Sequence, residues 1–239
     1  MDSKVVTLER HDDVAVISID DGKANALSAE VIAAINAALD TVEGVEPAGA
    51  VVIAGRDGMF SGGFDLKVMR GGDPRAIGSL VTSGGELVLR LYRSGRPVVC
   101  ACTGHAIAAG ALIALGSHLR VGADGDFRIG LIETTIGMVL PDWALLFAQE
   151  RVTRRHLHRA LVEGLAYSPP AAVEAGFLDL VVSPDQVLKT AIEEGSRLAA
   201  LPGAAYAGNA AKLRAPGITR IEKALADDRR AVEGGAAII

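Results

Sequence analysis

Glu133 is a lone charged residue in a long apolar stretch, and a carboxylate in such surroundings can do proton-transfer chemistry. It is the only charged residue between Arg128 and Asp142. Apolar surroundings disfavour the ionised form of a carboxyl group and raise its pKa towards neutral pH, which suits a general base. The alternative is an ordinary glutamate on a short surface turn. The apolar residues around it are Leu131, Ile132, Ile136, Met138, Val139 and Leu140.

Two segments of the chain that contain glycine-bearing bends have the same predicted order of elements. In VVIAGRDGMFSGGFDLK (residues 51–67) and in PVVCACTGHAIAAGALIAL (residues 97–115), a buried strand is followed by a bend and then by a helix start. Within residues 58–69 we expect neither strand nor helix before a helix begins near Phe64. The first N–H groups of a helix have no partner inside it, so each bend offers free backbone donors. Facing each other, two such donors would form an oxyanion hole; singly, each bend is an ordinary strand-to-helix turn.

The two segments resemble those of the crotonase (enoyl-CoA hydratase/isomerase) family. FSGGFDLK is similar to the family's first oxyanion segment and GHAIAAGALIAL to its second, and the resemblance covers nearly the whole chain, fading in the last helices. It implies an α/β fold, a crotonase-like (ββα) superhelix of strand-strand-helix units with a C-terminal helical region. It implies oxyanion donation by the backbone N–H groups of Phe64 and Ala109. The family commonly has glycine at Ala108 and Ala109, and we expect this departure to be mild.

The resemblance also implies a coenzyme A thioester as substrate, with no separate cofactor and no metal ion. Leu112, Pro141 and Asp142 would then lie at the acyl group. Lys23 and Lys67 would approach the phosphates, or they are simply solvated surface lysines. The residues implied to border the coenzyme are Lys23, Ala24, Ala26, Gly63, Asp65, Leu66 and Lys67.

Leu112 is the most informative departure from the family pattern. Hydratases of the family carry a second glutamate at this position, and the pair of carboxylates holds the attacking water. One carboxylate suffices to move a proton from C2 to C4, so the sequence favours a Δ3,Δ2-enoyl-CoA isomerase in fatty acid metabolism. Two alternatives stay open: a hydratase, in which Glu133 works with Asp142 or a backbone-held water, and a non-catalytic acyl-CoA-binding protein. Asp142 is either a second acid in the acyl pocket or the cap of the helix that contains Trp143.

The order of predicted elements indicates an α/β protein with parallel strands. A hairpin (residues 5–10 and 14–20) precedes a helix capped by Ser28, and a second helix opens at Asp73-Pro74. We expect an α/β core over residues 1–167 and a helical region over 168–239 that is too small to form its own core. This second region would pack on the first or on neighbouring subunits, and the family resemblance implies a homotrimer or a dimer of trimers. The other predicted strands lie within residues 49–55, 97–104, 119–124, 127–130 and 177–183.

Composition excludes several other classes of protein. The 239 residues carry a net charge of −5 with no basic block, so no nucleic-acid partner is expected. The longest apolar run, residues 106–116, is too short to span a bilayer, and the charged N-terminal sequence has no apolar signal core. We therefore expect a cytoplasmic protein. Cys100 and Cys102 lack metal-ligand spacing and are expected to be buried without a disulfide.

Overall fold

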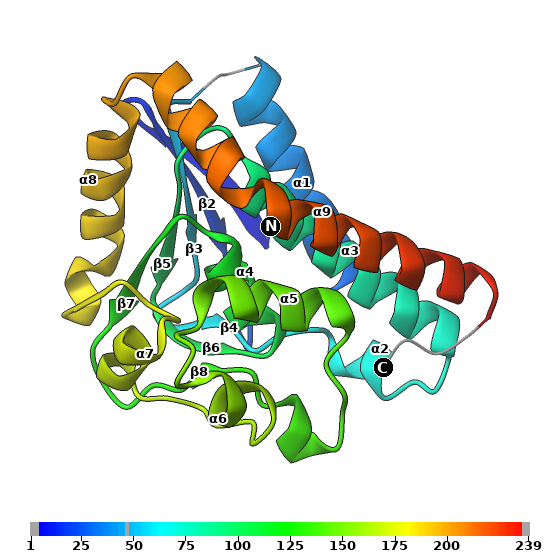
Figure 1. Ribbon diagram of the computed structural model, residues 1–239. Helices are drawn as coiled ribbons and strands as arrows, with labels where there is room; N and C mark the ends of the chain where they lie inside the picture. Colours follow the sequence, from blue (N-terminus) through cyan, green and yellow to red (C-terminus); the bar gives the residue numbers. More distant parts are fainter. Residues whose placement is uncertain (1–4, 46–47, 236–239) are drawn as a thin grey trace.

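A six-stranded sheet forms the centre of the molecule (Figure 1). The computed structural model describes residues 5–45 and 48–235. The first two strands form the predicted antiparallel hairpin, and every other neighbouring pair in this sheet is parallel. Across the sheet the strands are β1 (Val6–His11), β2 (Val14–Ile19), β3 (Ala50–Ala54), β5 (Val98–Cys102), β7 (Leu119–Ala123) and β9 (Leu180–Val182).

A second, smaller sheet lies beyond the ends of the first. Its three parallel strands are β4 (Gly58–Ser61), β6 (Gly104–Ile107) and β8 (Ile129–Gly130). The expectation of no strand within residues 58–69 is therefore wrong, because residues 58–61 pair with β6. Each predicted bend is instead a short strand followed by a helix start. The units are thus strand-strand-helix.

Successive side chains of the buried strands point to opposite faces of the main sheet, so the core consists of two apolar clusters. Val51 and Ile53 of β3 belong to one apolar cluster, while Val52 and Ala54 belong to the other. The first cluster is covered by three helices and also contains the free thiols of Cys100 and Cys102, which are buried on one face of β5 as expected. The three helices are α1 (Ala29–Asp40), α3 (Pro74–Arg93) and α4 (Ala109–Gly116).

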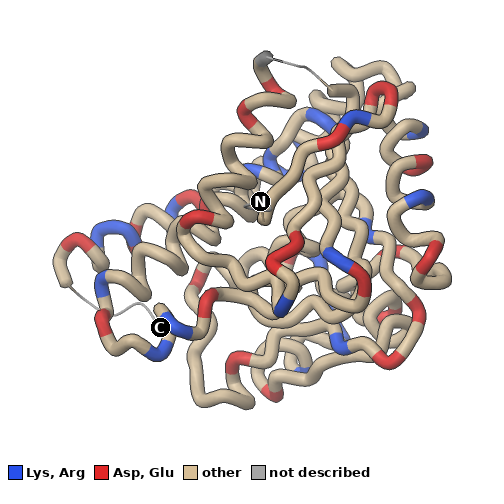
Figure 2. The backbone as a smooth tube through the Cα atoms, turned by 180° about the vertical axis from the view of Figure 1, so that it is seen from behind, with Lys and Arg blue, Asp and Glu red and all other residues tan. Residues whose placement is uncertain are grey.

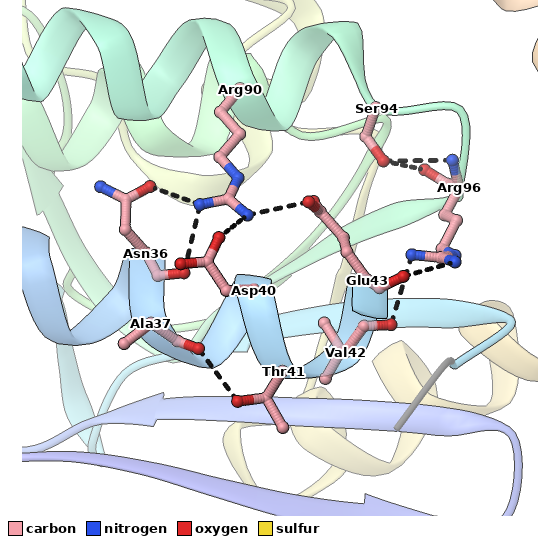
Figure 3. Close-up of polar contacts among 9 residues, drawn as sticks. All are labelled: Asn36, Ala37, Asp40, Thr41, Val42, Glu43, Arg90, Ser94 and Arg96. Atoms are coloured by element: carbon pink, nitrogen blue, oxygen red, sulfur yellow. Dashed lines mark hydrogen bonds and ion pairs between the residues drawn. The ribbon is translucent and has the colours of Figure 1, made fainter. Parts of the chain in front are cut away.

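Ion pairs and hydrogen bonds join α1 to α3 (Figure 3). Arg90 of α3 donates to the backbone and side-chain oxygens of Asn36 at 3.1 and 3.0 Å. Its other terminal nitrogen lies 2.6 Å from an Asp40 carboxylate oxygen and 2.8 Å from one of Glu43, which belongs to the π-helical turn η1 (Thr41–Val45). Ser28 caps α1 as predicted and accepts a hydrogen bond from the Val31 N–H. These contacts hold α1 against α3.

The part of the chain after residue 167 packs on both sides of the main sheet. Helix α8 (Val187–Ala199) covers the second apolar cluster, and β9 extends the sheet beside β7. Helix α9 (Gly203–Glu233) lies along α3 and α5 (Asp142–Arg151) (Figure 1). It packs closely on two glycines of α3: a Cβ added to Gly78 would be 2.4 Å from Val232, and one added to Gly85 would be 2.6 Å from Leu225. Residues 1–4 and 46–47 of the first predicted region and residues 236–239 of the second lie outside the described residues. The remaining elements are α2 (Leu66–Met69), η2 (Glu133–Ile136), α6 (Leu157–Leu161), α7 (Pro169–Ala175) and η3 (Pro184–Gln186).

Charged residues of both signs are interspersed along the chain. Figure 2 shows lysine and arginine positions next to aspartate and glutamate positions, with no long stretch of one sign. Within the part of the chain that the structure describes, no helix has the length and apolar character needed to cross a bilayer.

Candidate active site

An apolar pocket with a volume of about 440 Å³ opens where the smaller sheet meets α2, α3 and α5. Phe64, Leu112 and Trp143 line its inner part. Three large apolar side chains on its wall are exposed: Leu66 (53%), Ile136 (54%) and Val139 (72%). Exposed apolar side chains around a hollow are typical of a site that binds an apolar ligand.

The two glycine-bearing segments meet at one edge of this pocket. A Cβ added to Gly63 would lie 3.3 Å from the Ala109 nitrogen and 3.0 Å from the Ala108 Cβ. One added to Gly110 would lie only 2.3 Å from the Ser61 carbonyl oxygen. Gly63 also has a φ of 96°, which favours glycine. The absence of side chains at these two positions therefore lets the backbones of the two segments approach.

The N–H groups of Phe64 and Ala109 are free at this meeting point. Leu27 bonds to the residues on either side of Phe64: its N–H donates to the Gly63 oxygen (2.8 Å) and its oxygen accepts from Asp65 N–H (3.1 Å). In a parallel bridge of this kind, the N–H of the intervening Phe64 points away from Leu27. Ala109 is the first residue of α4, so its N–H has no partner in the helix. Neither group donates a hydrogen bond to another of the described residues.

Ala108 adopts a backbone conformation that favours glycine. Its φ is 54° and its ψ is −125°, and its N–H donates to the Gly130 oxygen at 2.9 Å. The expectation that alanine would be a mild departure here is incomplete, because the methyl group adds backbone strain as well as bulk. The strained residue immediately precedes the free N–H of Ala109.

Glu133 lies on the pocket wall at the start of η2, with 9% of its surface exposed. Its Oε2 is buried without a hydrogen-bond partner among the described residues. Burial raises the pKa of Glu133 from 4.5 to about 7, and a hydrogen bond from its own backbone opposes this only in part. The lone carboxylate of the apolar stretch between Arg128 and Asp142 is thus a buried group with a pKa of about 7.

The structure separates the three residues expected at the acyl group. Leu112 and Pro141 line the pocket, whereas Asp142 is exposed and is not among the lining residues. Asp142 is already the first residue of α5, and Pro141 occupies the N-cap position. The capping interpretation of Asp142 is therefore wrong, although a carboxylate in the first turn still interacts favourably with the helix dipole.

The segment expected to border the coenzyme lies beside the first glycine bend. The Gly62 N–H donates to the Ala24 oxygen at 2.8 Å, next to the pocket residue Phe64. Asp65 caps α2 through a hydrogen bond from the Lys67 N–H. Lys23, Ala24, Leu66 and Lys67 are exposed, while Ala26 and Asp65 are half-buried and Gly63 is buried.

Sequence reasoning did not identify several residues that line the pocket. Val81 of α3 and Trp143 of α5 line the pocket, yet their apolar periodicity marks them only as core residues. Arg70, an exposed cation on the wall, gave no signal either. Within the described residues, no group of three or more His, Cys, Asp or Glu side chains is placed to hold a metal ion.

Comparison with known proteins assigns the class. The family described as enoyl-CoA hydratase/isomerase matches residues 9–233, and the chain belongs to this family. The predicted crotonase-like fold is confirmed by solved structures of the family.

Among curated relatives, human mitochondrial enoyl-CoA delta isomerase 1 is 34% identical over 191 residues, which cover 79% of this chain and 63% of that protein. The match thus spans less than two thirds of the human enzyme. The crystal structure of human mitochondrial delta3-delta2-enoyl-CoA isomerase has a TM-score of 0.89 at 31% identity, covering 97% of this chain and 92% of that one. The probable enoyl-CoA hydratase EchA3 from Mycobacterium tuberculosis has a TM-score of 0.91 at 36% identity, covering 97% and 98%.

Proposed function

We propose that the protein is an enzyme that moves the double bond of a 3-enoyl-CoA thioester to the 2-position, in fatty acid metabolism. The thioester oxygen accepts hydrogen bonds from the N–H groups of Phe64 and Ala109, and Glu133 moves the proton. The coenzyme A moiety runs past residues 23–26 and 63–67, and the acyl chain fills the apolar pocket. The reaction needs no group beyond the substrate and these residues.

The proton returns to the substrate in two steps. The Glu133 carboxylate removes a proton from C2, and the electron pair of the C–H bond delocalises onto the thioester oxygen. The two backbone donors stabilise this dienolate, and each is worth about 3 kcal/mol of barrier. Glu133, now a neutral acid, gives the proton to C4, and the electrons return to form the C2–C3 double bond.

The observation that carries this proposal is a single carboxylate in the pocket. Glu133 is the only acidic residue among the described lining residues, and Leu112, 2% exposed, occupies the position of the second glutamate of family hydratases. An apolar side chain at this position cannot orient an attacking water. The named delta isomerases among the relatives point the same way.

Replacing the carboxylate by its amide tests the proton shuttle. We expect Glu133→Gln to lower kcat for isomerisation of a 3-enoyl-CoA by about 10³-fold, because proton transfer by a positioned base contributes at this scale. Formation of the conjugated 2-enoyl product is the measurement. Asp142→Asn, the same change on an exposed carboxylate outside the pocket, is the matched control and should keep wild-type turnover. Unchanged turnover in Glu133→Gln would exclude Glu133 as the base.

A hydratase is the second candidate, because relatives named as probable hydratases match the chain as well. Hydration of crotonyl-CoA at rates far above the uncatalysed reaction would favour it over the isomerase. Tight acyl-CoA binding with no turnover of either 2-enoyl- or 3-enoyl-CoA would favour a non-catalytic acyl-CoA-binding protein. Product analysis with short, medium and long substrates distinguishes the three.

We also propose that the protein assembles as a homotrimer or a dimer of trimers through the region 168–239. The first half of α9 supports this, because Leu213 is 80% exposed and Leu201, just before the helix, is 43% exposed. Both border a shallow hollow on this surface. A cytoplasmic location stays a prediction from the sequence, to be tested by cell fractionation.

A further inference from the structure

Asn25 is a fully buried polar residue beneath the first glycine bend. None of its surface is exposed, and its side chain spans three segments. Its Nδ2 lies 2.7 Å from the Ile19 oxygen and 3.1 Å from the oxygens of both Met59 and Phe60, and its Oδ1 accepts from the Asp21 N–H at 3.0 Å. Every polar atom of the amide is therefore used on backbone groups, and two of these belong to β4.

The backbone of Asn25 is held as firmly as its side chain. Its φ of 49° lies in the left-handed region, which asparagine tolerates better than most residues. One Asp21 carboxylate oxygen accepts from the N–H groups of Lys23 (2.7 Å) and Asn25 (2.8 Å), and the other accepts from Ala26 (3.1 Å). The loop that carries Asn25 is thus closed on itself before it contacts β4.

Ser61 continues the connection towards the pocket. It is also fully buried. Its Oγ donates to the backbone oxygen of Asn25 at 2.8 Å and accepts from the Gly63 N–H at 3.2 Å. Gly63 is bonded in turn to Leu27 and precedes Phe64. A series of hydrogen bonds therefore leads from Asn25 through Ser61 to the N–H of Gly63, and the carbonyl group of Gly63, which shares its peptide unit with the Phe64 N–H, is held by Leu27.

We infer that Asn25 and Ser61 are positioning residues for the reaction: they orient the Phe64 N–H towards the thioester oxygen. This inference rests on the proposed function. The second donor, Ala109, is held by other contacts, because Ala108 bonds to Gly130 of β8. Loss of the Asn25 series would misdirect one donor and leave the other in place. A displacement of about 1 Å at a reacting centre costs on the order of 10²-fold in rate.

The test uses two probes that separate orientation of the donor from binding of the coenzyme. Acetoacetyl-CoA forms an enolate whose absorbance reports stabilisation of a negative thioester oxygen, and free coenzyme A reports the binding surface alone. For Asn25→Asp, which replaces the two N–H donors by an acceptor facing three carbonyl oxygens, we expect enolate absorbance and kcat to fall by about 10²-fold. The dissociation constant for coenzyme A should stay within about threefold of wild type, which is less than 1 kcal/mol.

Ser61→Ala is the second variant, because it removes one hydroxyl without adding a charge and is therefore a milder change than Asn25→Asp. We expect enolate absorbance and kcat to fall in this variant as well, by about tenfold, because one hydrogen-bonding group of the series is lost. The matched controls are Asn36→Asp, whose Oδ1 accepts from Arg90 away from the pocket, and Ser117→Ala, another fully buried serine that donates to a backbone oxygen. Both should keep wild-type enolate absorbance.

The possible outcomes separate this inference from the proposed function. Wild-type protein that neither isomerises 3-enoyl-CoA nor forms the enolate overturns the proposed function. Wild-type activity together with unchanged enolate absorbance in Ser61→Ala overturns the positioning role. A parallel loss of kcat, coenzyme A affinity and melting temperature in both variants also overturns it, because a purely structural role predicts that pattern.

Discussion

Burial of Glu133 links the chemistry of this residue to pH. The group must be ionised to accept a proton, and burial raises its pKa to about 7. We therefore expect kcat/KM for isomerisation to rise as the pH increases through about 7 and to level off above it. A pH profile of the wild-type enzyme measures this. A profile already flat between pH 5 and 8 would contradict it.

The same burial makes Glu133 costly for stability. A carboxyl whose pKa is raised on folding stabilises the protein fully below pH 4.5, and this contribution is lost as the pH rises through about 7. Glu133→Gln should therefore be more stable than wild type at pH 8, by roughly 2–3 kcal/mol, and equally stable at pH 4. Urea unfolding at the two pH values is the measurement. An equal difference at both values would show that ionisation is not the cause.

Strain at Ala108 predicts a stabilising substitution. Its φ of 54° is unfavourable for alanine but not for glycine, so Ala108→Gly should raise the free energy of unfolding by about 1 kcal/mol. Ala111→Gly, inside the helix α4 that Ala108 precedes, should lower the free energy of unfolding by about 1 kcal/mol and is the control. Denaturant unfolding of both variants tests the pair, and equal destabilisation would argue against strain at Ala108.

Among the helices, α9 is attached to the core by a buried network around His118. Arg214 of α9 lies 2.6 Å from the His118 Nε2 and donates to the Tyr92 oxygen at 2.8 Å. Arginine only donates, so Nε2 is its acceptor, while Nδ1 lies 2.8 Å from the Tyr206 hydroxyl and 3.3 Å from the Val98 nitrogen. The guanidinium groups of Arg151 and Arg214 both stack on the Tyr92 ring, 5.1 and 5.2 Å from its centre.

This network predicts loss of stability in acid. Burial, aided by the charges of Arg214 and Arg151, lowers the pKa of His118 to about 3, so the unfolded state takes up a proton below pH 6.5 and the folded state does not. Stability should fall by up to about 1.4 kcal/mol for each pH unit between 6.5 and 3. His118→Gln should flatten this part of the melting-temperature profile, whereas the exposed His11→Gln should leave it unchanged. A profile with the wild-type slope in His118→Gln would show that His118 is not the cause of the loss of stability in acid.

Long, strongly patterned elements could be predicted from the sequence, and the short strands could not. Helix α3 opens at Asp73-Pro74 as expected, because a capping side chain and a proline act locally. Strands β4 and β6 have four residues each and contain Gly58 and Gly104, so no apolar alternation identifies them. They are strands because they pair with each other, and this pairing joins parts of the chain that are distant in sequence.

At the scale of the whole molecule, the exposed apolar side of α9 predicts association. Leu213→Glu should shift the protein from a trimer-based mass towards the monomer, because a buried charge at an interface is costly. Sedimentation equilibrium measures the mass. Val162→Glu, a similar change at an exposed apolar residue (56%) that follows α6, should leave the mass unchanged. A monomeric wild-type protein would exclude the proposed assembly.

The candidate site was visible in the sequence only where chemistry needs an unusual residue. Glu133 is conspicuous because it is a lone charge in an apolar stretch, and the bends because they hold glycines between apolar runs. Asn25 gave no such signal, since its importance comes from carbonyl groups on β2 and β4 that only the folded chain brings to it. Arg70 and Val81 reach the pocket wall for the same reason, through tertiary packing.

Because the two proposed donors to the thioester oxygen are peptide N–H groups, only replacement by proline would delete them. Leu66 and Val139, by contrast, stand exposed on the wall and can vary without disturbing the core. Substitutions at such wall residues can therefore change which acyl chains the pocket accepts, while the backbone groups proposed to bind the thioester oxygen stay the same.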